Sequence, residues 1–218
     1  MAKRAMTNEA KALKAQSILD KAVELFTSYD YEQIKMSDIA KEMNMSKGIL
    51  FVYFKTKESL FFHLLTREYE KRLQHLMNMI IETRINNEDD FKQLVMKELI
   101  ELVDHNPLYI RLESIRTSVL EKNIDAEVML ELKSGLYNKM IIMTNLLCDS
   151  GIVTEAAVMD IFQAEASIIT GCKLSATLPN EVIEIIERNG MHGFKRDFKA
   201  DVMDTMSYYL DGYFQGRR

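Results

Sequence analysis

Residues 36–60 read MSDIAKEMNMSKGILFVYFKTKESL, and this stretch decides how the rest of the chain is interpreted. Apolar residues recur at helical spacing in its first half, at Met36, Ile39, Ala40 and Met43. Asn44 tolerates the left-handed backbone conformation that often ends a helix, and Ser46 can cap a following helix with its hydroxyl. The pattern therefore predicts two short helices joined by a tight turn, the second of them over residues 47–54.

Such a pair of helices can bind DNA, because the second helix lies in the major groove while the first crosses the backbone. Lys47 and the first amides of the second helix can meet a phosphate. Gly48 lets the backbone approach DNA closely because it has no side chain. Tyr53 offers a hydroxyl, and Lys57 places a charge at the start of the next helix.

The remainder of the chain also has helical character. The whole chain contains 218 residues with only 8 Gly and 2 Pro, and no segment alternates with the period of a strand. We expect an all-α protein with an N-terminal three-helix domain over residues 1–60 and a larger helical domain over 61–218. The expected helices cover residues 11–28, 36–43, 47–54, 57–85, 90–104, 107–121, 124–149, 154–175, 180–188 and 195–214.

The charge is distributed unevenly along the chain. The whole sequence has a net charge of −5, whereas residues 1–60 carry 10 basic and 8 acidic side chains, a net charge of +2. This asymmetry indicates one DNA-facing segment on an otherwise acidic protein. The two cysteines match no metal or redox spacing, and neither a secretory signal nor a membrane span is recognised. We expect a reduced, cytoplasmic protein.

Four segments in register resemble the DNA-binding domain of the TetR family of bacterial transcriptional regulators. They are Ile18 to Phe26, Asp38-Ile39-Ala40, Ser46-Lys47-Gly48 and Tyr53 to Glu58, with matching order and spacing over about 50 residues. The resemblance implies a homodimer that reads a palindromic double-stranded DNA operator through a helix-turn-helix at about 35–54. It implies these DNA-binding residues: Ser37, Ser46, Lys47, Gly48, Ile49, Phe51, Val52, Tyr53 and Lys57.

Several residues depart from the family pattern. Lys35 stands at the usual Ser or Thr cap, and Asn44 replaces the usual turn glycine. Ile49 and Phe51 replace a frequent Thr and a frequent Tyr. The last two changes remove hydroxyls and leave apolar surface that can meet thymine methyl groups. We therefore expect DNA binding, but the operator sequence cannot be taken from relatives.

The resemblance also implies an effector pocket in the second domain and a dimer interface formed by the helices at 154–175 and 195–214. The many methionines there either fill an ordinary core or line an adaptable apolar pocket. The preferred hypothesis is a repressor that leaves DNA when a small hydrophobic effector binds. Pocket candidates are Tyr109, Arg116, Met140, Met143, Asn145 and Gln163, with Glu165 as a further polar group on an apolar helix.

Other chemistry has weaker support. The four histidines form no metal-ligand spacing, no nucleophile stands in a recognisable context, and no cofactor is expected. Glu98 and Glu101 share one helical face and are expected to be solvated. The basic residues Lys3, Arg4, Lys11 and Lys14 could reach DNA or belong to an uninvolved tail. Two alternatives remain: a helical interaction protein that has lost DNA binding, and an all-helical enzyme.

Overall fold

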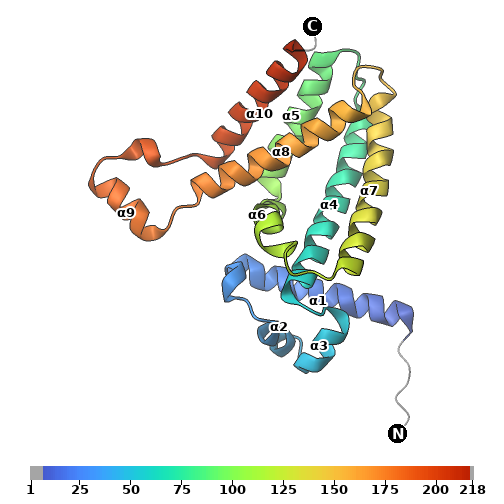
Figure 1. Ribbon diagram of the computed structural model, residues 1–218, viewed down its shortest axis with the longest axis vertical. Coiled ribbons are helices and arrows are strands. Elements are labelled where there is room, and N and C mark those ends of the chain that lie inside the picture. Colours follow the sequence, from blue (N-terminus) through green and yellow to red (C-terminus); the bar gives the residue numbers. More distant parts are fainter. Residues whose placement is uncertain (1–6, 217–218) are drawn as a thin grey trace. The chain divides into compact units, whose positions relative to one another are not determined.

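The computed structural model describes residues 7–216, and these form helices and no strand (Figure 1). The prediction of an all-α fold is therefore confirmed. Lys3 and Arg4 lie outside the described residues. In chain order the elements are α1 (Asn8–Ser28), η1 (Tyr31–Gln33), α2 (Met36–Glu42), α3 (Lys47–Tyr53), α4 (Lys57–Glu82), α5 (Glu88–His105), α6 (Pro107–Ile115), η2 (Arg116–Leu120), α7 (Ala126–Cys148), α8 (Glu155–Ala176), α9 (Asn180–Arg188), η3 (His192–Phe194) and α10 (Phe198–Gln215).

The helix boundaries lie within a few residues of those expected from the sequence, with one change of type. The helix expected over residues 107–121 has α geometry only to Ile115, and the π-helix η2 follows it. The chain divides into two compact units. The N-terminal unit contains residues up to 67 together with 116–133, and the C-terminal unit contains 68–115 and 134–216. The expected functional boundary after residue 60 stays a prediction.

The N-terminal unit has a core in which α1 packs against the start of α4. Phe61 of α4 meets Phe26 of α1 edge to face, with ring centroids 5.2 Å apart, and meets Tyr31 of η1 at 5.0 Å. Edge-to-face rings place a positive ring edge on a negative ring face, which stabilises the pair beyond its burial. Leu50 of α3 and Ile39 of α2 are fully buried. Helix α3 is thus anchored by Leu50, and α2 by Met36, Ile39 and Ala40.

The C-terminal unit has a separate core. Helix α8 packs against α6 and α10, and α10 also packs against α5. Phe91 of α5 meets Phe214 of α10 edge to face at 5.9 Å. Beyond the adjoining ends of α8 and α10, α9 and η3 form a separate projection (Figure 1), closed by an ion pair between Glu187 and Lys195 at 2.6 Å. The core of this unit is therefore built from the second half of α4, from α5, α6, α8 and α10, and from Met143 and Leu147 of α7.

Candidate nucleic-acid interface

The turn between α2 and α3 has the geometry expected from the sequence. Asn44 has a φ of 51°, the left-handed conformation. The Met45 amide donates to the Ala40 carbonyl at 2.9 Å, and the Asn44 amide donates to the Lys41 carbonyl at 3.0 Å. These two bonds satisfy carbonyls that the end of a helix otherwise leaves without partners. The prediction that Asn44 ends α2 is confirmed.

The starts of both helices are capped locally. The Ser46 hydroxyl accepts a hydrogen bond from the Ile49 amide at 3.3 Å, as predicted. Lys35 gives α2 no side-chain cap, but the Asp38 carboxylate accepts from the Lys35 amide at 3.0 Å. The departure from Ser or Thr at position 35 therefore leaves α2 without a hydroxyl cap, and the Asp38 carboxylate, which accepts from the Lys35 amide, is the side-chain contact at its start.

Helix α3 exposes apolar side chains over most of its surface. Leu50 faces the core, whereas Ile49, Phe51 and Val52 are exposed by 51%, 37% and 70%. A seven-residue helix that points three large apolar side chains at solvent loses the stabilisation that their burial would provide. Such a surface indicates contact with another molecule. Thymine methyl groups in a major groove offer the matching apolar contact.

Polar groups accompany this surface. Lys47 is exposed at the first position of α3, with its ammonium 5.4 Å from the centre of the Phe51 ring. Ser37 is exposed in the first turn of α2, and Tyr53 is half-buried at the end of α3. A Cβ built on Gly48 would meet its nearest neighbour, Ser46 Oγ, at an ordinary distance of 3.9 Å. The fold therefore does not itself require glycine at position 48.

Lys57 has an internal role that sequence reasoning missed. Its ammonium donates to the carbonyls of Tyr31 and Ile34 at 2.6 and 2.9 Å, and lies 3.8 Å from the centre of the Tyr31 ring. Partial burial lowers the pKa of this lysine. Because Lys57 holds the connection between α1 and α2, it supports the helix-turn-helix. Its contact with phosphate stays a prediction.

An open hollow of about 650 Å³ lies between α1 and the turn of the helix-turn-helix. Leu13 and Ile49 contribute apolar surface to it, while Lys14 and Ser17 contribute polar groups from α1. Lys14 thus lines the same hollow as Ile49 of α3, and its contact with DNA stays a prediction. No pattern in the sequence of α1 indicated this hollow, because it depends on how α1 packs on the turn.

The residues expected to line an effector pocket have diverse surroundings. Tyr109 and Met143 are buried and Met140 is half-buried in the C-terminal unit, whereas Asn145 and Gln163 are exposed there. Arg116 lies in the N-terminal unit and forms an ion pair with Glu121 at 3.1 Å. These positions leave the assignment of the pocket a prediction.

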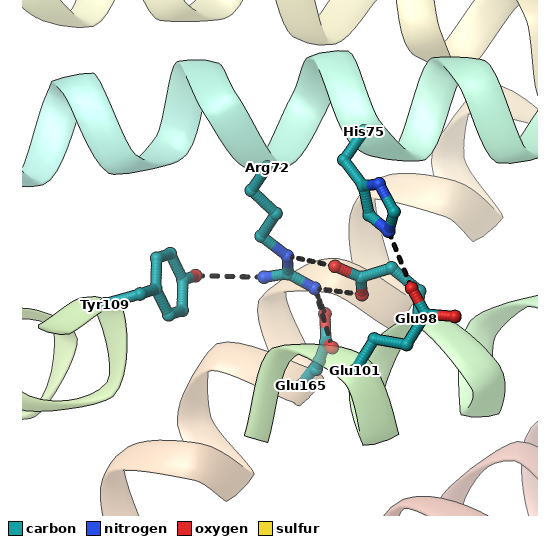
Figure 2. A network of polar contacts seen from close by, with 6 residues as sticks. All are labelled: Arg72, His75, Glu98, Glu101, Tyr109 and Glu165. Carbon is teal, nitrogen blue, oxygen red and sulfur yellow. Dashed lines mark hydrogen bonds and ion pairs between the residues drawn. The ribbon is translucent and has the colours of Figure 1, made fainter. Parts of the chain in front are cut away.

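The expectation that Glu98 is solvated is wrong. Glu98 is 2% exposed and binds Arg72 of α4, as Figure 2 shows. Glu165, a further pocket candidate, is fully buried and binds the same arginine. Glu101 is more exposed than Glu98 and bonds His75 at 2.8 Å. A helical-spacing argument cannot separate these two glutamates, because the buried arginine comes from a distant segment of sequence.

Among residues 7–216, no group of three or more His, Cys, Asp or Glu side chains is arranged to hold a metal ion. Within the same range, no helix is long and apolar enough to cross a membrane.

The helix-turn-helix with its exposed second helix defines a DNA-binding protein, and comparison with known proteins identifies its class. Residues 18–64 match the family described as "Bacterial regulatory proteins, tetR family". Residues 66–217 match the family described as "Tetracyclin repressor-like, C-terminal domain". The chain belongs to the TetR family of transcriptional regulators, a family of DNA-binding proteins and not of enzymes.

Individual relatives agree with this assignment. The chain is 23% identical over 184 residues to the uncharacterised HTH-type transcriptional regulator YdgC of Bacillus subtilis (strain 168), covering 78% of this chain and 88% of YdgC. It is 33% identical over 66 residues to YuxN, a regulator from the same strain, covering 30% of this chain and 23% of YuxN. The fold is similar to that of the fatty acid degradation regulator FadR from Bacillus halodurans, with a TM-score of 0.56, 19% identity, and coverage of 91% and 95% of the two chains.

Proposed function

We propose that this protein is a transcriptional repressor that binds a palindromic operator as a homodimer and leaves it when a small hydrophobic effector binds. The observation that carries DNA binding is the surface of α3, where Ile49, Phe51 and Val52 are exposed beside Lys47. Apolar groups can read thymine methyls while the lysine meets phosphate. The proposed DNA binding supports a cytoplasmic location, because bacterial DNA lies in the cytoplasm.

The homodimer is proposed through α8 and α10. Helix α8 carries the small residues Ala164, Ala166 and Gly171, which allow a partner helix to approach closely. Tyr208 of α10 is 76% exposed and offers aromatic area of the kind that interfaces use. Light scattering of the purified protein tests the dimer directly. A monomeric mass at micromolar concentration would contradict it.

Selection from a library of random duplexes tests the proposed function without knowledge of the operator. We expect the protein to enrich a palindrome whose half-sites contain thymines, because a twofold dimer imposes its symmetry on the site. Lys47→Ala should weaken binding about threefold to tenfold and lower the salt slope by about one unit, since one counterion-releasing contact is lost. Lys139→Ala in the C-terminal unit serves as the control and should change neither quantity.

The effector is tested separately, by thermal shift with acyl chains and with small charged compounds. The proposal expects apolar or amphipathic molecules to raise the melting temperature and to release the selected duplex, because a ligand shifts a conformational equilibrium only if it prefers one state. Stabilisation by highly charged compounds alone would contradict a hydrophobic effector. Failure to enrich any duplex would favour the alternative of a helical interaction protein that no longer binds DNA.

A further inference from the structure

Arg72 of α4 joins four helices of the C-terminal unit (Figure 2). Its Nε and Nη2 donate to the two oxygens of Glu98 on α5, at 2.8 and 2.7 Å. Its Nη1 donates to the hydroxyl of Tyr109 on α6 at 2.9 Å. Nη2 also lies 2.7 Å from each carboxylate oxygen of Glu165 on α8. The side chains of Arg72, Glu98 and Glu165 are only 8%, 3% and 0% exposed, so these charges lie out of water.

The two carboxylates are not held equally. The Nε–Nη2 edge of Arg72 gives Glu98 one N–H for each oxygen, which is the strong bidentate arrangement. Nη2 has two hydrogens, and Glu98 takes one of them. The two oxygens of Glu165 must share the other. Glu165 is therefore the more weakly held partner, and Arg72 can lose it while its bond to Glu98 stays intact.

The charge of the cluster also singles out Glu165. One guanidinium faces two carboxylates, and buried Glu113 of α6 adds a third negative group that bonds the Tyr69 hydroxyl of α4. Burial raises the pKa of Glu165 to about 7; Arg72 opposes this rise, while Glu98 and Glu113 add to it. Helix α10, which packs on α8, buries the apolar residues Val202, Met206, Leu210 and Phe214. Glu165 is thus the group that can take a proton from water.

We propose that the ion pair between Arg72 and Glu165 is the contact through which α8 positions α4, and that a proton bound by Glu165 releases this contact and changes operator affinity. Protonation removes one acceptor oxygen and the charge of Glu165, while Arg72 keeps Glu98. The inference rests on the proposed function. Helix α4 starts at Lys57, four residues after α3 ends at Tyr53, and continues into the C-terminal unit, so its position can bias the DNA-binding helices.

The test compares operator affinity between pH 6 and pH 8 for the wild type and two variants. Glu165→Gln keeps the shape of the side chain but has no charge at any pH. Glu101→Gln is the matched control, because Glu101 lies on α5 one turn from Glu98. Its partner is His75, whose side chain is more exposed than that of Arg72. Because Glu101→Gln removes the carboxylate partner of His75, this control shows whether that pair contributes to the pH dependence.

We expect the wild-type affinity for the selected duplex to change at least threefold between these pH values, with a midpoint near 7. Glu165→Gln should show the wild-type pH 6 affinity throughout, and Glu101→Gln should follow the wild type. A Glu165→Gln profile that coincides with the wild-type profile would overturn the inference. The pH profile of wild-type operator affinity can be measured without any variant. If that affinity did not change from pH 6 to pH 8, the inference would be overturned even if Glu165→Gln did not fold.

Amide hydrogen exchange at pH 8 measures the loss of the contact between Arg72 and Glu165 without DNA. In Glu165→Gln the amides near Arg72 on α4 and near position 165 on α8 should exchange at least threefold faster than in the wild type, whereas Glu101→Gln should not differ. If the wild type enriches no duplex, the proposed function is overturned, and the effect on operator affinity with it. If the wild type binds DNA and Glu165→Gln matches it in both measurements, only the positioning role is overturned.

Discussion

The surface of α3 and the cluster around Arg72 invert the usual distribution of side chains in opposite ways. Helix α3 exposes Ile49 and Val52 by 51% and 70%, whereas the C-terminal unit leaves Glu98 and Glu165 only 2% and 0% exposed. Apolar side chains ordinarily lie inside a protein and charged ones outside. Exposed apolar surface on α3 indicates contact with another molecule, whereas the buried charges depend on the partners that the fold provides.

The two regions differ in how much the fold depends on them. The exposed side chains of α3 support little of the core, since Leu50 and Phe54 hold this segment in place. Removing them should therefore change binding and leave stability nearly intact. The charges of the Arg72 cluster satisfy one another away from water, so removing one of them leaves its partners unpaired. Substitutions can separate these two kinds of site.

The largest effect is expected for Arg72→Met. This change leaves Glu98 and Glu165 buried without a cation, and should lower the free energy of unfolding by about 3–5 kcal/mol. Urea denaturation followed by circular dichroism measures it. Lys139→Met is the control, because its ion pair with Glu70 at 2.6 Å is about half exposed and should contribute less than about 1 kcal/mol. Equal decreases in the free energy of unfolding of the two variants would show that the buried ion pairs of Arg72 stabilise the fold no more than an exposed pair does.

The pH dependence of stability should follow Glu165. Its pKa is about 7 in the folded protein, against an ordinary value of 4.5, so between these values the folded state binds more protons than the unfolded state. The free energy of unfolding should therefore fall as pH rises from about 5 to 8, by up to roughly 3 kcal/mol from this group. The difference between wild-type and Glu165→Gln urea curves isolates the contribution. A difference that stays constant with pH would refute it.

Lys47 and Lys57 offer a comparison within the DNA-binding region. Lys57→Met removes the donor to the carbonyls of Tyr31 and Ile34, and should lower the free energy of unfolding by about 1–3 kcal/mol as well as weaken DNA binding. Lys47→Met should weaken DNA binding alone, because the Lys47 side chain is exposed. Thermal melts and duplex titrations of the two variants test this. Identical melting temperatures would rule out a supporting role for Lys57.

The smallest effect on folding is expected for Gly48→Ala. Alanine fits position 48, where an added Cβ meets Ser46 Oγ at 3.9 Å, and its higher helix propensity should stabilise the protein by up to about 1 kcal/mol. The same methyl group would stand where the backbone is expected to approach DNA, so the affinity for the selected duplex should fall. An unchanged affinity would move the DNA-contacting face away from the start of α3.

The sequence predicted the local parts of the DNA-binding region well. Asn44 and Ser46 act through backbone groups only a few residues away, so their roles as turn and cap could be inferred from residue type alone. The helices were located to within a few residues for a similar reason, because apolar spacing along one segment reports its buried face. The hollow beside α1 could not be inferred in this way, since it forms where separate helices meet.

The sequence by itself therefore determined the helical class, the helix-turn-helix and the family, because each depends on interactions over a few residues or on motifs in register. Only the tertiary structure decided that Glu98 is buried, that Lys57 holds a neighbouring loop, and that Glu165 shares one arginine with Glu98. The partners of Arg72 lie 26, 37 and 93 residues away along the chain. Spacing within one helix carries no information about such partners, because packing between helices brings them together.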